Sequence, residues 1–164
     1  INSSSLNIAT SSTLSIEPGV ALKFNNNGIS VKGIFNVIGD ETNKILFTSI
    51  YDDSDGNDAT NDGQSSTTTV GNLWQGLVME SNSVSQIKNA EIKYATTGIS
   101  YIDSSINLEN VKFEKNHLGI SADEASRINH SANIGNIEFA GNEIDTNPQG
   151  FLTETSTTTS EDSL

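Results

Sequence analysis

Short runs of alternating apolar and polar residues extend through residues 14–147, and this period of two predicts β-strands. Gly, Asn, Asp and Pro separate the runs, which are three to five residues long. No stretch of ten or more residues has the apolar spacing of three and four that a helix requires. We therefore predict an all-β chain of short strands. The clearest early ones cover residues 14–16, 20–24, 29–31, 35–37 and 45–50.

One short pattern occurs three times in the second half of the chain. In each copy an aliphatic residue is followed two positions later by Asn, and three positions further on by Ile or Phe. The asparagines are Asn89, Asn110 and Asn136. A period in the low twenties with β-type alternation is typical of a solenoid, in which successive coils stack along an axis.

Two all-β architectures fit short strands of this kind. One is an antiparallel sandwich built from hairpins, for which Asn27-Gly28 is a turn signal. The other is a right-handed parallel β-helix with about 21–26 residues per coil. Only the β-helix requires residues one coil apart to lie above one another. Gly98 and Gly119 have the same separation as the first two repeats, so the register favours the β-helix.

The repeated asparagines have a physical use in such a stack. Asn110 is predicted above Asn89, and Asn116 and Asn142 each follow a repeat Asn by six residues. Stacked Asn side chains can hydrogen-bond along the axis as a ladder, and Asn tolerates the left-handed backbone of a sharp corner. We therefore expect Asn ladders at the corners of the coils.

Several motifs occur in a fixed order along the chain. They are Leu14–Phe24, Gly33–Gly39, Ile45–Ser49 and, after an Asp/Gly/Asn-rich loop, Trp74–Leu77. In this order of motifs the chain resembles the right-handed β-helix repeat region of bacterial surface and extracellular proteins, which is similar in fold to pectate lyases. The resemblance covers about residues 10–145 and implies an exported protein, often a segment of a longer chain. It does not select a function, because this fold hosts lyases, hydrolases, adhesins and spacers.

The composition divides the chain into a domain and a tail. Residues 1–146 are predicted to form a single β-helix domain, interrupted by a long acidic loop at 51–72. Residues 147–164 are rich in Ser and Thr and are predicted to be a tail or linker. Loops as long as 51–72 are usually functional, or are ordered by something other than a core.

The charge balance excludes some classes of partner. The chain has 8 Lys and Arg against 21 Asp and Glu, a net charge of −13. Nucleic acid is not expected, because phosphate binding needs clustered basic residues. The chain has no Cys, which excludes disulfides and thiolate metal sites. No apolar run is long enough to span a bilayer, so membrane insertion is not expected.

The acidic loop is the best candidate site. Oxygen-bearing side chains alternate before Gly63, as in the first half of a calcium loop. The Glu expected at position 12 of an EF-hand is replaced by Thr69, so upstream carboxylates such as Asp52 would have to complete the sphere. We predict a bound Ca²⁺; the alternative is a solvated acidic loop. The proposed ligands are Asp53, Asp55, Asn57, Asp58, Thr60 and Asp62.

The remaining polar and aromatic residues favour a structural role. Glu91, Lys112 and Glu138 occupy the same place in the three repeats, which indicates alternating charges on stacked strands. Trp74 is predicted to pack under the loop and His117 to lie at a corner. No residue is predicted to be catalytic.

These observations predict a non-catalytic structural or adhesive segment of an exported cell-surface or filament-forming protein. Its expected partners are copies of itself or neighbouring coils of a longer chain, with cell-surface glycan as a further candidate. The alternative is a carbohydrate-active enzyme or a carbohydrate-binding module, which would need paired carboxylates and aromatic platforms on one face.

Overall fold

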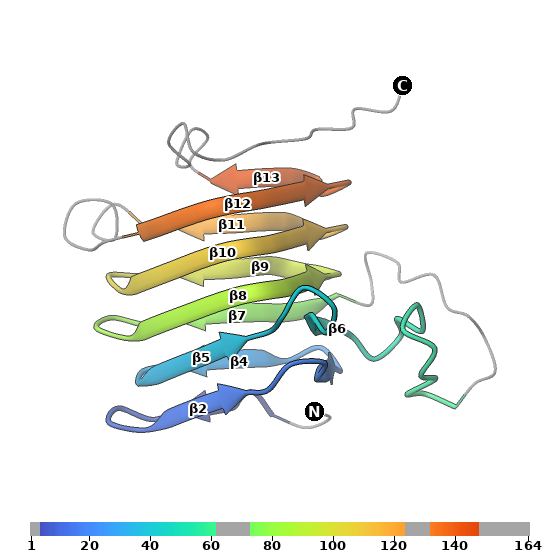
Figure 1. Ribbon diagram of the computed structural model, residues 1–164, viewed down its shortest axis with the longest axis horizontal. Helices are drawn as coiled ribbons and strands as arrows, with labels where there is room; N and C mark the ends of the chain where they lie inside the picture. The colour runs from blue at the N-terminus through green and yellow to red at the C-terminus, as the bar shows by residue number, and fades with distance from the viewer. Residues whose placement is uncertain (1–3, 62–72, 124–131, 148–164) are drawn as a thin grey trace.

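The computed structural model describes residues 4–61, 73–123 and 132–147, with the backbone alone described at 132, 133 and 147. These residues form thirteen β-strands and no helix (Figure 1). The strands are β1 (Leu6–Ile8), β2 (Thr13–Ile16), β3 (Ala21–Phe24), β4 (Gly28–Val31), β5 (Ile34–Ile38), β6 (Ile45–Ser49), β7 (Trp74–Met79), β8 (Val84–Lys93), β9 (Ala95–Tyr101), β10 (Ser105–Glu114), β11 (Leu118–Ala122), β12 (Ala132–Ala140) and β13 (Ile144–Asn147).

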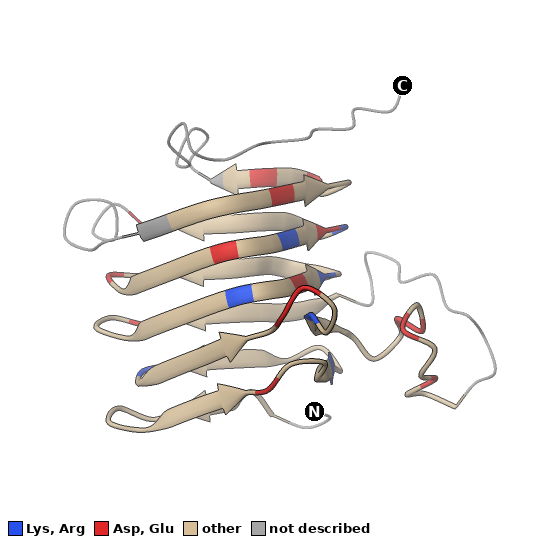
Figure 2. Cartoon of the chain, in the orientation of Figure 1, with Lys and Arg blue, Asp and Glu red and all other residues tan. Residues whose placement is uncertain are grey.

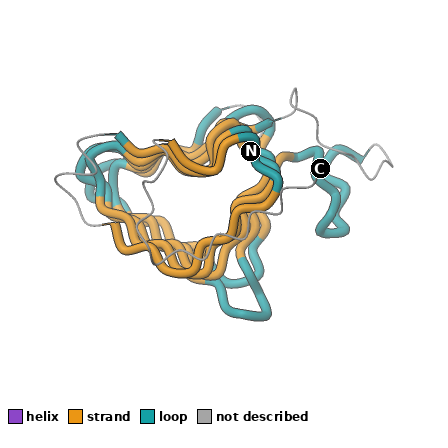
Figure 3. The backbone as a smooth tube through the Cα atoms, turned by 90° about the horizontal axis from the view of Figure 1, so that it is seen from above, coloured by secondary structure: helices purple, strands orange, loops and turns teal. Residues whose placement is uncertain are grey.

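The strands stack into a parallel β-helix of about five turns. One sheet has the order β1-β4-β7-β9-β11-β13, and the other has the order β12-β10-β8-β5-β2, with β3 and β6 completing its lower part. Every strand pair in the described ranges is parallel. Seen from above, successive coils superimpose around one interior (Figure 3). The β-helix prediction is confirmed, and the hairpin sandwich is wrong.

The coil lengths follow the register predicted from the repeats. Asn89 and Asn110 lie on adjacent coils and are 21 residues apart in the sequence. Asn110 and Asn136 lie on the next pair of coils and are 26 residues apart. Gly39 and Asn89 are also in contact across one coil, yet they are 50 residues apart, because the acidic loop is inserted between them. The inserted loop leaves the strand pairing below and above it intact.

The prediction of strands no longer than five residues is wrong for β7, β8, β9, β10 and β12, and the longest, β8 and β10, have ten residues each. Both strands continue through a repeat Asn that turns the corner on its own. The φ angles of Asn89, Asn110 and Asn136 are 50°, 55° and 55°, in the left-handed region. Asn adopts this region more readily than other residues with a side chain, so one residue redirects the strand without a loop.

The repeat asparagines form the predicted ladder. Asn110 Nδ2 donates to Asn89 Oδ1 at 2.5 Å, and Asn136 Nδ2 donates to Asn110 Oδ1 at 3.1 Å. Asn89 Nδ2 ends the row by donating to the carbonyl of Gly39 at 2.8 Å. Each amide therefore donates to the coil below it, and Asn89 and Asn110 also accept from the coil above.

A second ladder lies at the next corner. Asn116 Nδ2 donates to Asn142 Oδ1 at 3.0 Å and to the carbonyl of Ile92 at 2.9 Å. Asn116 is only 1% exposed, and its Oδ1 accepts from the backbone N–H of Ala95 at 2.8 Å. The side chain satisfies backbone groups that the corner would otherwise leave buried without partners.

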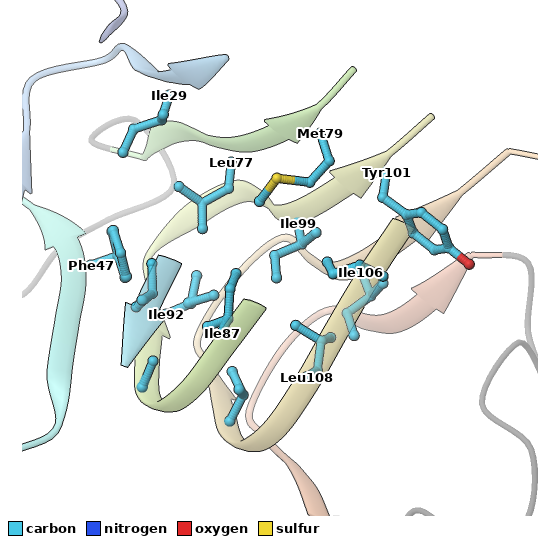
Figure 4. Packing of buried hydrophobic residues seen from close by; sticks show 14 of the residues in the cluster. Ile29, Phe47, Leu77, Met79, Ile87, Ile92, Ile99, Tyr101, Ile106 and Leu108 are labelled. Carbon is cyan, nitrogen blue, oxygen red and sulfur yellow. The ribbon is translucent and has the colours of Figure 1, made fainter. Parts of the chain in front are cut away.

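The interior between the sheets holds columns of apolar side chains (Figure 4). Ile92 pairs with Phe113, and Phe113 pairs with Phe139, whose ring stacks on it with centroids 5.4 Å apart. Gly98 and Gly119 make this stack possible, because a Cβ on either would lie 2.8 Å from the facing ring. The glycine register seen in the sequence is therefore a packing requirement.

We predict that Asn110→Ala lowers the free energy of unfolding by about 2–4 kcal/mol, because it places Ala in the left-handed region and removes two ladder hydrogen bonds. Asn110→Gly tolerates the backbone and loses only the ladder, so it should cost less. Asn107→Ala, on the outer face of the same strand, is the control, expected within about 0.5 kcal/mol of wild type. Urea unfolding measures all three, and equal costs at 107 and 110 would contradict the ladder's role.

Candidate functional site

The acidic loop leaves the stack directly after β6 (Figure 1). Its first carboxylate, Asp52, is 2% exposed and is held by two local hydrogen bonds. Thr48 Oγ1 donates to Asp52 Oδ2 at 2.7 Å, and the backbone N–H of Ser54 donates to Asp52 Oδ1 at 3.1 Å. Asp52 thus acts as a structural anchor that fixes the direction in which the loop departs.

Lys23, on the outer face of β3, lies at the centre of the first part of the loop. Its Nζ donates to the carbonyl oxygen of Asp52 at 2.6 Å, to Asp55 Oδ1 at 2.7 Å, and to the carbonyl oxygen of Asn57. Asp53 Oδ1 lies 3.9 Å away. The Lys23 side chain is only 10% exposed, so the loop encloses the ammonium group.

The ammonium lowers the pKa of Asp55 below its ordinary value of 3.8. Partial burial alone would raise this pKa, but hydrogen bonds from Lys23 and Asn57, together with the charge of Lys23, outweigh it. Asp55 Oδ1 also accepts from the backbone N–H of Asn57 at 3.1 Å, which closes a tight turn. The carboxylate therefore bonds both to the lysine and to the loop's own backbone.

The predicted calcium ligands are only partly brought together. Asp53, Asp55 and Asn57 surround Lys23, whereas Asp58 and Thr60 belong to a further turn. In that turn Asp58 Oδ1 accepts from the backbone N–H of Asn61 at 2.5 Å and from Thr60 Oγ1 at 3.1 Å.

Asp62, the last predicted ligand, lies outside the described residues, as do Gly63 and Thr69. Within the described ranges, no three Asp, Glu or His residues are grouped to hold a metal ion. The calcium site therefore stays a prediction. At the position of Lys23 the residues do not fit it, because a divalent ion there would meet an ammonium group.

Sequence reasoning missed Lys23, although a signal was present. Lys23 is the outward residue between the inward Leu22 and Phe24, and its parallel partner on β6 is Thr48. Because the loop begins just after β6, a lysine one coil below its start is well placed to meet its carboxylates. What the sequence does not reveal is that the loop folds back over β3.

A groove of about 310 Å³ lies between this part of the loop and the outer face of the sheet. Asp55 and Asn57 form one wall, and Lys44 and Glu91 form the other, with their charged atoms 3.1 Å apart. The floor comes from the edges of β3 and β6. The groove is lined by Gly19, Ala21, Lys44, Ile45, Leu46, Asp55, Asn57 and Glu91.

Above the loop, the predicted row of alternating charges is confirmed. Figure 2 shows acidic and basic segments on the stacked strands β8, β10 and β12. Lys112 pairs in register with Glu91 below and Glu138 above, and its Nζ lies 3.2 Å from Glu138 Oε1. Burial would lower the pKa of Lys112, but Glu138 and Glu114 outweigh it and raise this pKa. These carboxylates are engaged with lysines rather than arranged as a separated acid–base pair.

Trp74 and Tyr101 lie inside, whereas Tyr51 and Tyr94 are partly exposed and Lys115 Nζ lies 5.6 Å from the centroid of the Tyr94 ring. Trp74 is fully buried, stacks on Phe24 with centroids 4.4 Å apart, and donates from Nε1 to the carbonyl of Lys93 at 2.6 Å. Tyr101 is 1% exposed. The packing role predicted for Trp74 is confirmed. His117 lies at a corner, as predicted, with an exposed side chain 2.6 Å from Glu143.

No family model, curated protein or solved structure matches this chain with significance. The β-helix is therefore established by the stacking of the strands themselves, without support from a relative. No helix in the described residues is long and apolar enough to cross a bilayer.

We predict that Asp55 titrates below pH 3.8 in the folded protein and that Lys23→Met raises its midpoint, because burial then acts without the opposing ammonium. A depressed pKa contributes stability that is complete above the unfolded value and is lost as pH falls through the folded value. The lysine contact should therefore weaken only at pH below the ordinary range of Asp. Carboxyl NMR titration of both proteins measures this, and an unshifted wild-type midpoint would contradict it.

Proposed function

We propose that this chain is a non-catalytic structural or adhesive rod segment of an exported cell-surface or extracellular protein. The observation that carries the proposal is the vertical register of the described strands, which shifts only between Gly76 and Leu77, with two Asn ladders and apolar columns through successive coils. Such a stack resists bending, because every coil is hydrogen-bonded to its neighbours along its strands. The extracellular location rests on the sequence resemblance alone.

The N-terminal end of the stack supports an assembly role. In the described residues β2 pairs only with β5, and β3 pairs only with β6, so both present an unpaired strand edge. Leu14, Ile16 and Leu22 face the core from this end but are only partly buried. Unpaired strand edges beside a partly exposed apolar layer can pair with further strands. We therefore propose that another coil, or a second copy of this chain, stacks on the N-terminal end.

Calcium binding by the acidic loop remains part of the proposal. Its support is the alternation of oxygen-bearing side chains from Asp58 onward, of which Asp58 and Thr60 already face one another. The site would lie beyond the turn held by Lys23. Thermal unfolding in CaCl₂ and in EDTA tests this proposal, and equal unfolding midpoints in the two solutions would contradict calcium binding.

One observation favours the alternative of carbohydrate binding. A second groove of about 500 Å³ lies beside β2 and β5, and its lining combines polar and aliphatic side chains, which could contact sugar hydroxyls and ring faces. A polysaccharide panel, measured with and without chelator, separates this function from a purely structural one. The groove is lined by Ser15, Ile16, Glu17, Pro18, Asn36, Ile38 and Gln86.

We predict concentration-dependent association through the N-terminal end, weakened about a hundredfold or more by Leu14→Glu, because a carboxylate would be buried against the neighbour. Ile34→Glu is the matched control: Ile34 is 43% exposed on the lateral face, away from the end. Analytical ultracentrifugation and electron microscopy provide the readout. Monomers at every concentration would overturn end stacking, and loss of association in Ile34→Glu alone would assign it to the lateral face.

A further inference from the structure

We propose that the Lys23 ammonium is the built-in cation of the acidic loop. It occupies the point at which the oxygens of the loop's first turn converge, so residues 52–57 close against the sheet without a metal ion. This inference is independent of the proposed rod function, because it concerns the loop alone.

The hydrogen bonds of Lys23 Nζ are the first support. A lysine ammonium has three donors and no acceptor. The three oxygens that receive them are the carbonyls of Asp52 and Asn57 and the carboxylate of Asp55. Two of these acceptors are backbone atoms, so the contact specifies the path of the main chain as well as pairing a charge.

The second support is that hydrogen bonds within residues 48–56 hold the loop in place around Lys23 Nζ. Asp52 is fixed from below by Thr48, and the N–H of Gly56 donates to the carbonyl of Asp53 at 2.9 Å to close the turn. The side chains of Asp53 and Asp55 are only 7% and 15% exposed. Carboxylates so little exposed and so close together need a positive charge beside them.

The described contacts of Nζ suit an ammonium group. In proteins, Ca²⁺ is bound by about six to eight oxygen ligands at Ca–O distances of roughly 2.3–2.6 Å. Among the described residues, three oxygens accept directly from Nζ, and a fourth, Asp53 Oδ1, is 3.9 Å away. Three acceptors match the three N–H donors of an ammonium group. Because this ammonium belongs to a side chain of β3, it is present whatever metal ions the solution contains.

A consequence concerns the groove of about 310 Å³ beside the loop. Asp55 and Asn57, which form one of its walls, are both held by Lys23. The lysine therefore determines whether this wall exists. Without the ammonium, the carboxylates of Asp53 and Asp55 would repel one another, and an added divalent cation would become the remaining means of closing the turn.

The experiment uses the whole chain and follows amide hydrogen exchange by mass spectrometry in peptides covering residues 50–57, before the proposed calcium ligands Asp58 and Thr60. Lys23→Met removes the charge and keeps an unbranched side chain, whereas Lys23→Arg keeps the charge. Lys32→Met is the matched control, because Lys32 is an exposed lysine on the adjoining coil. Each protein is measured in EDTA and in CaCl₂, and circular dichroism verifies that the β-helix is folded.

In wild type and Lys32→Met we expect the same slow exchange at 50–57 in EDTA and in CaCl₂. Lys23→Met should exchange about tenfold faster or more in EDTA, because charge-assisted hydrogen bonds are lost, and should recover protection in CaCl₂. Lys23→Arg should remain closer to wild type than Lys23→Met in EDTA.

Two results would overturn the proposal. One is calcium-dependent protection of 50–57 in wild type, which would make a metal the organising cation of this turn. The other is unchanged exchange in Lys23→Met, which would show that the turn closes without the ammonium. If Lys23→Met does not fold, Asp55→Ala removes the carboxylate acceptor instead, and wild-type protection in that variant would equally overturn the proposal.

Discussion

The structure depends on one constraint: each residue must fit the residue one coil above it and the residue one coil below. Parallel pairing brings equivalent positions of successive coils into direct contact. A side chain at such a position must therefore pack well against the same type of side chain in the next coil. Asn89, Asn110 and Asn136 satisfy the constraint with amide hydrogen bonds, and Phe113 and Phe139 satisfy it by ring stacking. Gly98 and Gly119 satisfy it by leaving space for those rings.

The same constraint applies less strictly on the outer face, where charges rather than shapes are matched. Lys88 Nζ lies 2.8 Å from Glu109 Oε1 on the next coil, and Lys112 Nζ lies 3.2 Å from Glu138 Oε1. Exposed pairs of this kind contribute little stability individually, about 0–1 kcal/mol. Their value in a chain of net charge −13 is that they keep like charges from stacking in register, which would oppose the coils.

Much of the fold was predictable because the constraint leaves a periodic trace in the sequence. The regular separation of Asn89 and Asn110 was sufficient to place one above the other. The strand lengths were not predictable in the same way. A polar Asn inside an apolar alternation resembles a strand end, whereas here it adopts the left-handed conformation and lets β8 and β10 turn without stopping.

The candidate site was less predictable, because a loop has no period. The acidic residues from Asp52 to Asp58 were visible in the sequence, and the need for a cation followed from their charge. The identity of that cation depends on where the loop lies, and this is decided by Asp52 packing against Thr48 next to the outward Lys23.

A tethered ammonium and a free calcium ion can both neutralise carboxylates, but they give a loop different properties. Occupancy by calcium varies with its concentration and makes a loop a sensor, whereas a lysine in the adjacent strand is always present. In a scaffold whose coils transmit register from one to the next, a loop inserted in the middle is the place where order is most easily lost. Under our proposal, the ammonium group on β3 holds residues 52–57 against the sheet whatever ions the solution contains.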